Sequence, residues 1–213
     1  LYLMCSVVYI FIGISTLLKD PKSEVNKIFF IINITLYFWA IMLALMINSP
    51  DAATAAFYKR MTTFSCSFLY YEILYYSIFL TQKGKILNKK RLHLLLFLPA
   101  CGSFCLYFFN PYTSKDFVWT SYGWVSLLPQ NKSQIWNSYF NLYYILYVVV
   151  SILFIYYWGK KSKFKRELIQ SKIIVSSMII TSMIATITDV ILPLFKIQLI
   201  PQITIIAILI AIG

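Results

Sequence analysis

The chain has 213 residues, of which 60% are hydrophobic and only 12% are charged, and its formal net charge is +12. Because soluble domains carry about 25% charged residues, this composition excludes an ordinary soluble domain and indicates a protein surrounded by lipid. The Lys and Arg residues lie in short loops between apolar segments, which favours contact with lipid headgroups over nucleic-acid binding.

Seven apolar segments follow one another along the chain. They cover residues 1–18, 28–48, 58–81, 92–109, 139–158, 173–195 and 203–213. A helix needs about 20 apolar residues to cross a bilayer, and the first six segments meet or approach that length. The seventh segment would cross only about half of the bilayer. We therefore expect one all-α, polytopic seven-helix domain over residues 1–213, in a fragment of a longer protein whose last helix is truncated.

Basic residues alternate between the loops. Fourteen of the 19 Lys and Arg residues precede the second, fourth and sixth segments. They are Lys19, Lys22, Lys27, Lys83, Lys85, Lys89, Lys90, Arg91, Lys160, Lys161, Lys163, Lys165, Arg166 and Lys172. Since cytoplasmic loops carry the excess of Lys and Arg, these loops are predicted to be cytoplasmic. The chain then starts outside the cell membrane, and its C-terminal helix exits into the cytoplasm.

Other loop and side-chain features carry less information. The longest external loop, residues 110–137, is rich in Trp, Tyr and Phe, which is typical of an interfacial belt or of a lid over an external pocket. The four Cys residues and the single His show no metal-ligand spacing, so we expect neither a metal nor a cofactor. Buried Cys residues are expected to pack as small hydrophobic side chains.

Two carboxylates lie well inside the apolar segments, Glu72 and Asp189. Ionisable groups within a membrane usually face the bundle interior or a water-filled cavity. For Asp189, an ion pair or cap, with Arg60 as one partner, and a place in a ligand or signalling site both stay open. For Glu72, a protonated carboxyl bonded to Ser65 or Tyr76 is one interpretation, and a proton-relay or coupling role is the other.

The sixth segment has a face of small and polar residues, because Ser177, Thr181 and Ala185 recur at helical spacing below Asp189. This face suits close helix packing or a binding site. Pro193 follows Asp189 by four residues, so its ring removes the hydrogen bond to the Asp189 carbonyl and predicts a hinge.

Two further segments present polar side chains one helical turn apart. Asn33 and Tyr37 lie in the second segment, and Asn141 and Tyr144 lie on one side of the fifth. Hydrogen bonds between helices are the simpler use of these groups. Together they would also suit the lining of a cavity in the outer half of the bundle.

Several motifs in order resemble one family. Residues 33–44 read NITLYFWAIMLA, residues 57–85 read FYKRMTTFSCSFLYYEILYYSIFLTQKGK, and residues 186–195 read TITDVILPLF. These stretches, with the seven-segment layout, resemble the N-terminal seven-transmembrane sensor module of bacterial histidine kinases and diguanylate cyclases. Asp189, Pro193, Arg60 and Trp39 match positions of the family pattern and are carried over as candidates without an assigned ligand.

The resemblance implies a receptor in the bacterial cell membrane for an extracellular or membrane-dissolved small molecule or peptide. The signal would pass through the last helix to a cytoplasmic output enzyme, and the protein would act as a homodimer. The sequence does not choose between a kinase and a cyclase output. A small transporter or channel subunit is the alternative, although no internal repeat supports it. An intramembrane enzyme is disfavoured because the acidic residues are separated and only one His is present.

Overall fold

The computed structural model describes residues 1–82, 90–109, 117–126, 134–191 and 204–212. These residues are helical apart from the connections and one small hairpin. The elements are α1 (Tyr2–Lys19), α2 (Glu24–Ile47), α3 (Ala52–Leu80), α4 (Lys90–Phe108), β1 (Phe117–Thr120), β2 (Gly123–Ser126), α5 (Gln134–Lys161), α6 (Lys165–Ala185), the π-helix η3 (Thr186–Ile191) and α8 (Thr204–Ile212).

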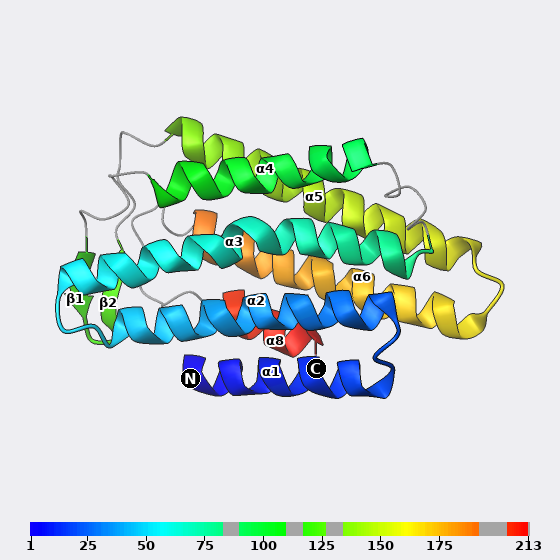
Figure 1. Cartoon of the computed structure of the whole chain (residues 1–213), viewed down its shortest axis with the longest axis horizontal. Coiled ribbons are helices and arrows are strands. Elements are labelled where there is room, and N and C mark those ends of the chain that lie inside the picture. Colours follow the sequence, from blue (N-terminus) through cyan, green and yellow to red (C-terminus); the bar gives the residue numbers. More distant parts are fainter. Residues whose placement is uncertain (83–89, 110–116, 127–133, 192–203, 213) are drawn as a thin grey trace.

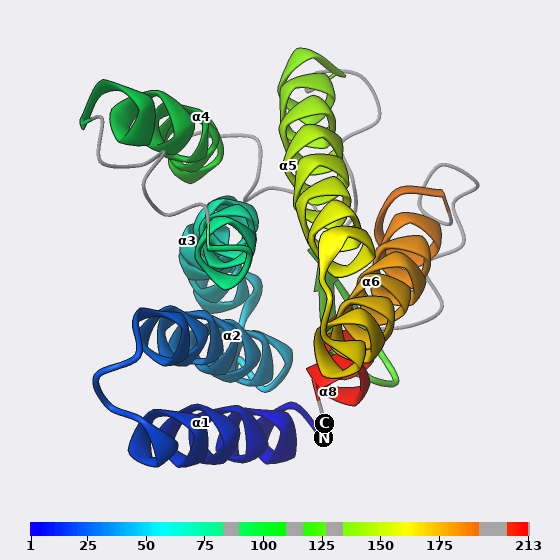
Figure 2. The ribbon, with the colours of Figure 1, turned by 90° about the vertical axis from the view of Figure 1, so that its right-hand side faces the viewer.

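The long helices run side by side as one bundle (Figure 1). Seen end-on in Figure 2, α1, α2, α3 and α4 follow one another along one side, and α5 and α6 form the other side. Helix α8 contacts both α1 and α6, so it joins the two sides of the bundle. One apolar core lies between α1, α2, α3 and α8, and a second lies between α3, α4 and α5.

Five of the described helices are long and apolar enough to cross a membrane, namely α1, α2, α4, α5 and α6 with the start of η3. Helix α3 has 29 residues but carries many Tyr, Ser and Thr side chains, and its composition falls short of this criterion. The described part of α8 has nine residues. The prediction of an all-helical membrane protein is therefore confirmed, whereas seven crossings and their direction stay predictions.

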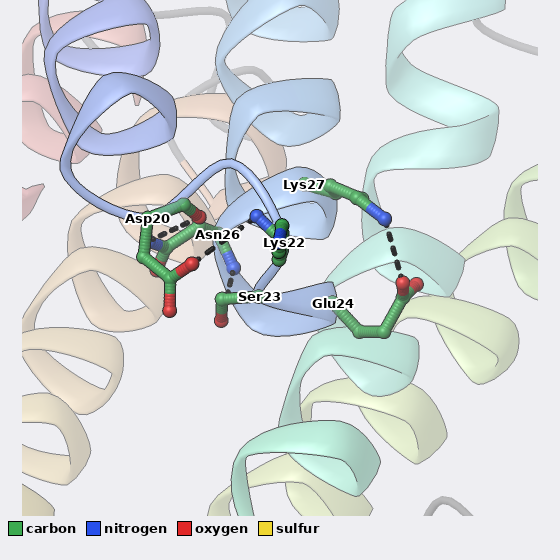
Figure 3. A network of polar contacts seen from close by, with 6 residues as sticks. All are labelled: Asp20, Lys22, Ser23, Glu24, Asn26 and Lys27. Carbon is green, nitrogen blue, oxygen red and sulfur yellow. Dashed lines mark hydrogen bonds and ion pairs between the residues drawn. The ribbon is translucent and has the colours of Figure 1, made fainter.

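The α1–α2 connection is closed by local polar contacts (Figure 3). Ser23 is the N-cap of α2 and accepts a hydrogen bond from the Asn26 backbone N–H, as capping residues do. The Asn26 amide also donates to the Asp20 carbonyl at 3.2 Å. Lys27 and Glu24 form an exposed ion pair at 2.7 Å, which contributes little to stability. The sharp turn is thus set by the cap and the Asn26 side chain.

The α2–α3 connection lies at the opposite end of the bundle. Asp51 is the N-cap of α3 and accepts hydrogen bonds from the Thr54 backbone N–H at 2.8 Å and from its hydroxyl at 3.0 Å. These bonds from Thr54 hold the pKa of the Asp51 carboxyl below its usual range. The negative charge of Asp51 also suits the positive end of the α3 dipole.

The β-hairpin packs against this same connection. Trp124 donates from its indole nitrogen to the Ser49 carbonyl at 2.8 Å, and its ring stacks edge-on with Trp119. Gly123 has a φ of +101° and lies directly against Ile47, where a side chain would collide with the end of α2. In the aromatic loop that was expected to form a belt or a lid, the described residues therefore form an anchor on the end of α2.

Candidate ligand cavity

Five helices line a half-open cavity of about 300 Å³ between the two sides of the bundle. Its lining comes from Phe29, Ile32 and Leu36 of α2, Leu69, Tyr70, Ile73 and Tyr76 of α3, Tyr144, Val148 and Ile155 of α5, Ile173, Ile174, Ser177, Met178, Thr181, Ser182 and Ala185 of α6, and Thr204 and Ile208 of α8. The cavity runs from the middle of the bundle toward the end that holds the α1–α2 and α5–α6 connections. This volume lies at the low end of the range for small-molecule sites.

The lining is apolar, and its polar groups are all hydroxyls. None of the described residues that line the cavity carries a charge. The hydroxyl groups belong to Tyr70, Tyr76, Tyr144, Ser177, Thr181, Ser182 and Thr204. The described ranges also contain no group of three or more His, Cys, Asp or Glu residues that could hold a metal ion. The chemistry available in the cavity is therefore hydrogen bonding and apolar contact.

The small, polar face predicted on the sixth segment lines this cavity through Ser177, Thr181 and Ala185. Hydroxyls elsewhere on the same helix bond to their own backbone. Ser176 donates to the Lys172 carbonyl at 2.8 Å, as serine in a helix commonly does. Within the described part of the chain, the hydroxyls of Ser177 and Thr181 have no hydrogen-bond partner. These two groups are therefore available to a molecule in the cavity.

Tyr144 joins α5 to the junction between α6 and η3. Its hydroxyl donates to the Ser182 carbonyl at 3.2 Å and lies 3.3 Å from the Thr186 hydroxyl. Thr186 begins the π-helix, a geometry that is frequent at functional sites. Asp189 lies in the same π-helix, but its side chain and the whole of Pro193 lie outside the described residues. Their predicted roles stay predictions.

Glu72 bonds across to α2. The Thr35 hydroxyl donates to Glu72 Oε1 at 2.8 Å, so the partner is Thr35 rather than Ser65 or Tyr76. The second carboxyl oxygen, Oε2, is buried and has no partner among the described residues. Sequence reasoning missed Thr35, and the available signal was a hydroxyl inside an apolar segment. The Glu72 carboxyl thus joins α2 to α3 and does not line the cavity.

The remaining candidates are spread over the bundle. Asn33 is fully buried, and its amide donates to the Phe29 carbonyl at 2.8 Å. Trp39 is buried in the first core, against which Tyr37 packs. Asn141 and Arg60 are half-buried, and none of these residues lines the cavity.

Buried polar atoms without a partner recur among these candidates. Within the described ranges, Trp39 Nε1, Asn33 Oδ1 and Arg60 Nε are buried with no hydrogen bond. The structure therefore brings Thr181 and Tyr144 to one cavity, while Asn33, Tyr37 and Asn141 are not part of its lining.

A row of tyrosines on α5 bonds to backbone carbonyls of the neighbouring helices, and sequence reasoning missed it. Tyr139 donates to the Pro99 carbonyl at 2.9 Å, and Tyr147 donates to the Leu96 carbonyl at 2.6 Å, both on α4. Tyr143 lies between them at the same helical spacing and faces α3. The spacing of four residues was the signal that could have identified this row.

The Tyr143 hydroxyl bonds to two backbone groups of α3 that lie one helical turn apart. It donates to the Ser67 carbonyl at 2.8 Å and accepts from the Tyr71 backbone N–H at 3.1 Å. In a regular helix this carbonyl and this N–H bond to each other.

Basic side chains gather at one end of the bundle. The α1–α2 and α5–α6 connections lie together at this end, which we call the basic end (Figure 1). It includes Lys19, Lys22, Lys27, Lys160, Lys161, Lys163, Lys165 and Arg166. The fold therefore groups charges that the sequence separates by more than a hundred residues.

Comparison with known proteins gives one result. The family model described as the N-terminal 7TM region of histidine kinase matches residues 1–213. Neither the curated proteins nor the solved structures contain a match.

Proposed function

Because the chain belongs to the family of N-terminal 7TM regions of histidine kinases, we propose that it is the sensor domain of a bacterial two-component receptor. The family and the five span-length apolar helices together support a membrane sensor domain. The family match over the full sequence carries the proposal. The described fold adds a cavity to which a signal could bind.

The cavity suggests how a signal would act. A ligand shifts a conformational equilibrium only when it binds two arrangements of the protein with different affinity. Helices α6 and α8 both line the cavity and contact each other, so a ligand that changes their spacing would move α8. The last helix would then transmit this movement to a cytoplasmic kinase, and a homodimer would allow the two kinases to respond together.

The basic end is proposed to face the cytoplasm. Excess Lys and Arg mark cytoplasmic loops and attract anionic lipid headgroups. Labelling of a Lys163→Cys variant, in which the four native Cys residues are replaced by Ser, with a membrane-impermeant thiol reagent in intact cells tests this orientation. We expect no labelling until the membrane is permeabilised, and labelling of intact cells would reverse the topology.

The signalling role is tested by filling the cavity in the full-length kinase. Thr181→Trp places a large side chain in the cavity, whereas Ile180→Trp changes the next residue, which is 58% exposed and is not part of the cavity lining. We expect autophosphorylation in membrane vesicles to change for Thr181→Trp and to match the wild type for Ile180→Trp. Equal kinase activity of all three proteins at equal membrane insertion would reject the role of the cavity.

We also propose that Asp189 and Pro193 couple the cavity to the last helix, with Arg60 and Trp39 as further positions shared with the family pattern. Asp189 lies in the π-helix that directly follows the cavity-lining part of α6, which supports this role. Asp189→Asn is expected to change the dose response of a kinase chimera and to leave membrane insertion intact. An unchanged dose response would remove Asp189 from the mechanism.

A further inference from the structure

We propose that the cavity binds an uncharged, largely apolar small molecule that carries a single oxygen-containing polar group, the chemistry of a medium-chain alcohol, ketone or ester. This inference rests on the proposed sensor function and names the ligand class of the same site. It replaces the broad expectation of a small molecule or peptide with one chemical class.

The lining excludes a charged ligand. Among the described residues, the lining of the cavity includes no Lys, Arg, Asp, Glu or His, so a charged group held there would receive no counter-ion from them. Burial of an unpaired charge is strongly unfavourable. Glu72 does not supply one, because its carboxyl bonds to Thr35 between α2 and α3 and is not part of the lining. Ions, amino acids and charged peptides therefore do not fit.

The unbonded hydroxyls in the cavity would form hydrogen bonds with an oxygen atom of the ligand. Ser177 and Thr181 lie one helical turn apart on α6, and Tyr76 reaches the cavity from α3. In the residues that the structure describes, none of these three hydroxyls has a hydrogen-bond partner. Each can donate one bond and accept two, so one ligand oxygen can satisfy more than one of them. The adjacent Ser176, which does not line the cavity, already donates to its own helix.

The size of the cavity limits the rest of the molecule. About 300 Å³ is the lower bound of common ligand pockets, which suits one alkyl chain or a small ring system rather than a folded peptide. The apolar walls come from α2, α3, α5, α6 and α8, so burial of the alkyl part supplies the affinity. The hydroxyl face of α6 then supplies the discrimination between a ligand with an oxygen and a pure hydrocarbon.

The test is photoaffinity labelling of the full-length protein in nanodiscs. The probe is a medium-chain primary alcohol that carries a diazirine, and the labelled peptides are mapped by mass spectrometry. Competitors are the matching alcohol, alkane, carboxylate and alkylammonium. We expect saturable labelling of α6 that the alcohol displaces and the two charged compounds do not. The double variant Ser177→Ala/Thr181→Val should raise the half-saturating concentration by about tenfold.

The matched control is Ser176→Ala, which removes a hydroxyl next to Ser177 but outside the cavity lining. It should label like the wild type. Equal displacement by the carboxylate or the ammonium, equal displacement by alcohol and alkane, or no effect of the double variant would each overturn the ligand class. Displacement by phospholipid but not by alcohol would show that a membrane acyl chain fills the cavity, and it would also overturn the proposal.

Kinase activity measured in the same nanodiscs separates this inference from the proposed function. Saturable alcohol binding without any change in autophosphorylation would support the ligand class and reject the sensor function. Conversely, autophosphorylation that responds to a compound unable to displace the probe would support the sensor function and reject the ligand class.

Discussion

Replacement of Tyr143 by Phe removes one oxygen atom that two residues of α3 share. That oxygen donates to the Ser67 carbonyl and accepts from the Tyr71 N–H. Tyr143 is only 3% exposed, so no water from the surface can take the place of the hydroxyl. The ring itself stays, and the contacts of the α5 face are otherwise unchanged. The variant therefore isolates the effect of the shared hydroxyl.

The change in the free energy of unfolding depends on how the backbone of α3 responds to the loss of the hydroxyl. The Ser67 carbonyl and the Tyr71 N–H lie one helical turn apart, so they can bond to each other once the hydroxyl is gone. The variant then loses one net hydrogen bond rather than two. A net hydrogen bond contributes about 1 kcal/mol in proteins and about 0.6 kcal/mol between membrane helices. We expect the free energy of unfolding to fall by roughly 0.5–1 kcal/mol.

Reversible unfolding of the purified protein in mixed detergent micelles measures this difference. Tyr156→Phe is the control, because Tyr156 is 49% exposed and its hydroxyl makes no hydrogen bond among the described residues. Its stability should match the wild type. The Tyr71 amide should remain protected from hydrogen exchange in Tyr143→Phe, because its N–H then bonds to the Ser67 carbonyl. A loss near zero, or above about 2 kcal/mol, would refute closure of the helix, since two orphaned groups cost about 1–3 kcal/mol each.

Three further predictions concern contacts between and within helices. Thr35→Val should lower the free energy of unfolding by about 1–3 kcal/mol, because it removes the hydrogen bond to the Glu72 carboxyl. The same substitution should cost less in a Glu72→Leu background, and additive losses in this double-mutant cycle would contradict the pairing. Gly159→Ala should destabilise the protein despite the higher helix propensity of Ala, because the new methyl group meets the Ser171 side chain, and Ser171→Gly should restore the unfolding midpoint. Asp51 has a lowered pKa in the folded protein, so its charge contributes stability above its unfolded pKa of about 3.9, and this stability is lost as the pH falls through the folded pKa. The free energy of unfolding of the wild type and of Asp51→Ala, measured from pH 7 down to acid, should converge only in that range. A constant difference between the two proteins would contradict the linkage.

Periodic features were predictable from the sequence because they depend on one helix alone. Length and apolar composition identified the helices, and the spacing of Ser177, Thr181 and Ala185 placed these residues on one face of α6. The same spacing rule could have identified the Tyr row on α5. The pattern was present in the sequence, but the sequence of α5 alone does not predict which backbone carbonyls its Tyr hydroxyls will bond to.

Pairings between helices were not predictable in the same way. The bond from Thr35 to Glu72 depends on how α2 and α3 are rotated and shifted against each other. The position of the cavity depends on five helices at once, so the polar pairs that were expected to line it did not identify its walls. Helix α3 shows the opposite problem, because its apolar segment predicts a span while its hydroxyl-rich composition weakens that assignment.

If α3 is one of the spans, its composition also predicts an order of events during biosynthesis. A segment that is too polar to leave the translocation channel for lipid by itself must wait for neighbours that shield its hydroxyls and its carboxylate. Helix α2 is made earlier and supplies Thr35, but α4 and α5, which cover other parts of α3, emerge from the ribosome later. Release of α3 from the channel is therefore expected only after α5 has been synthesised.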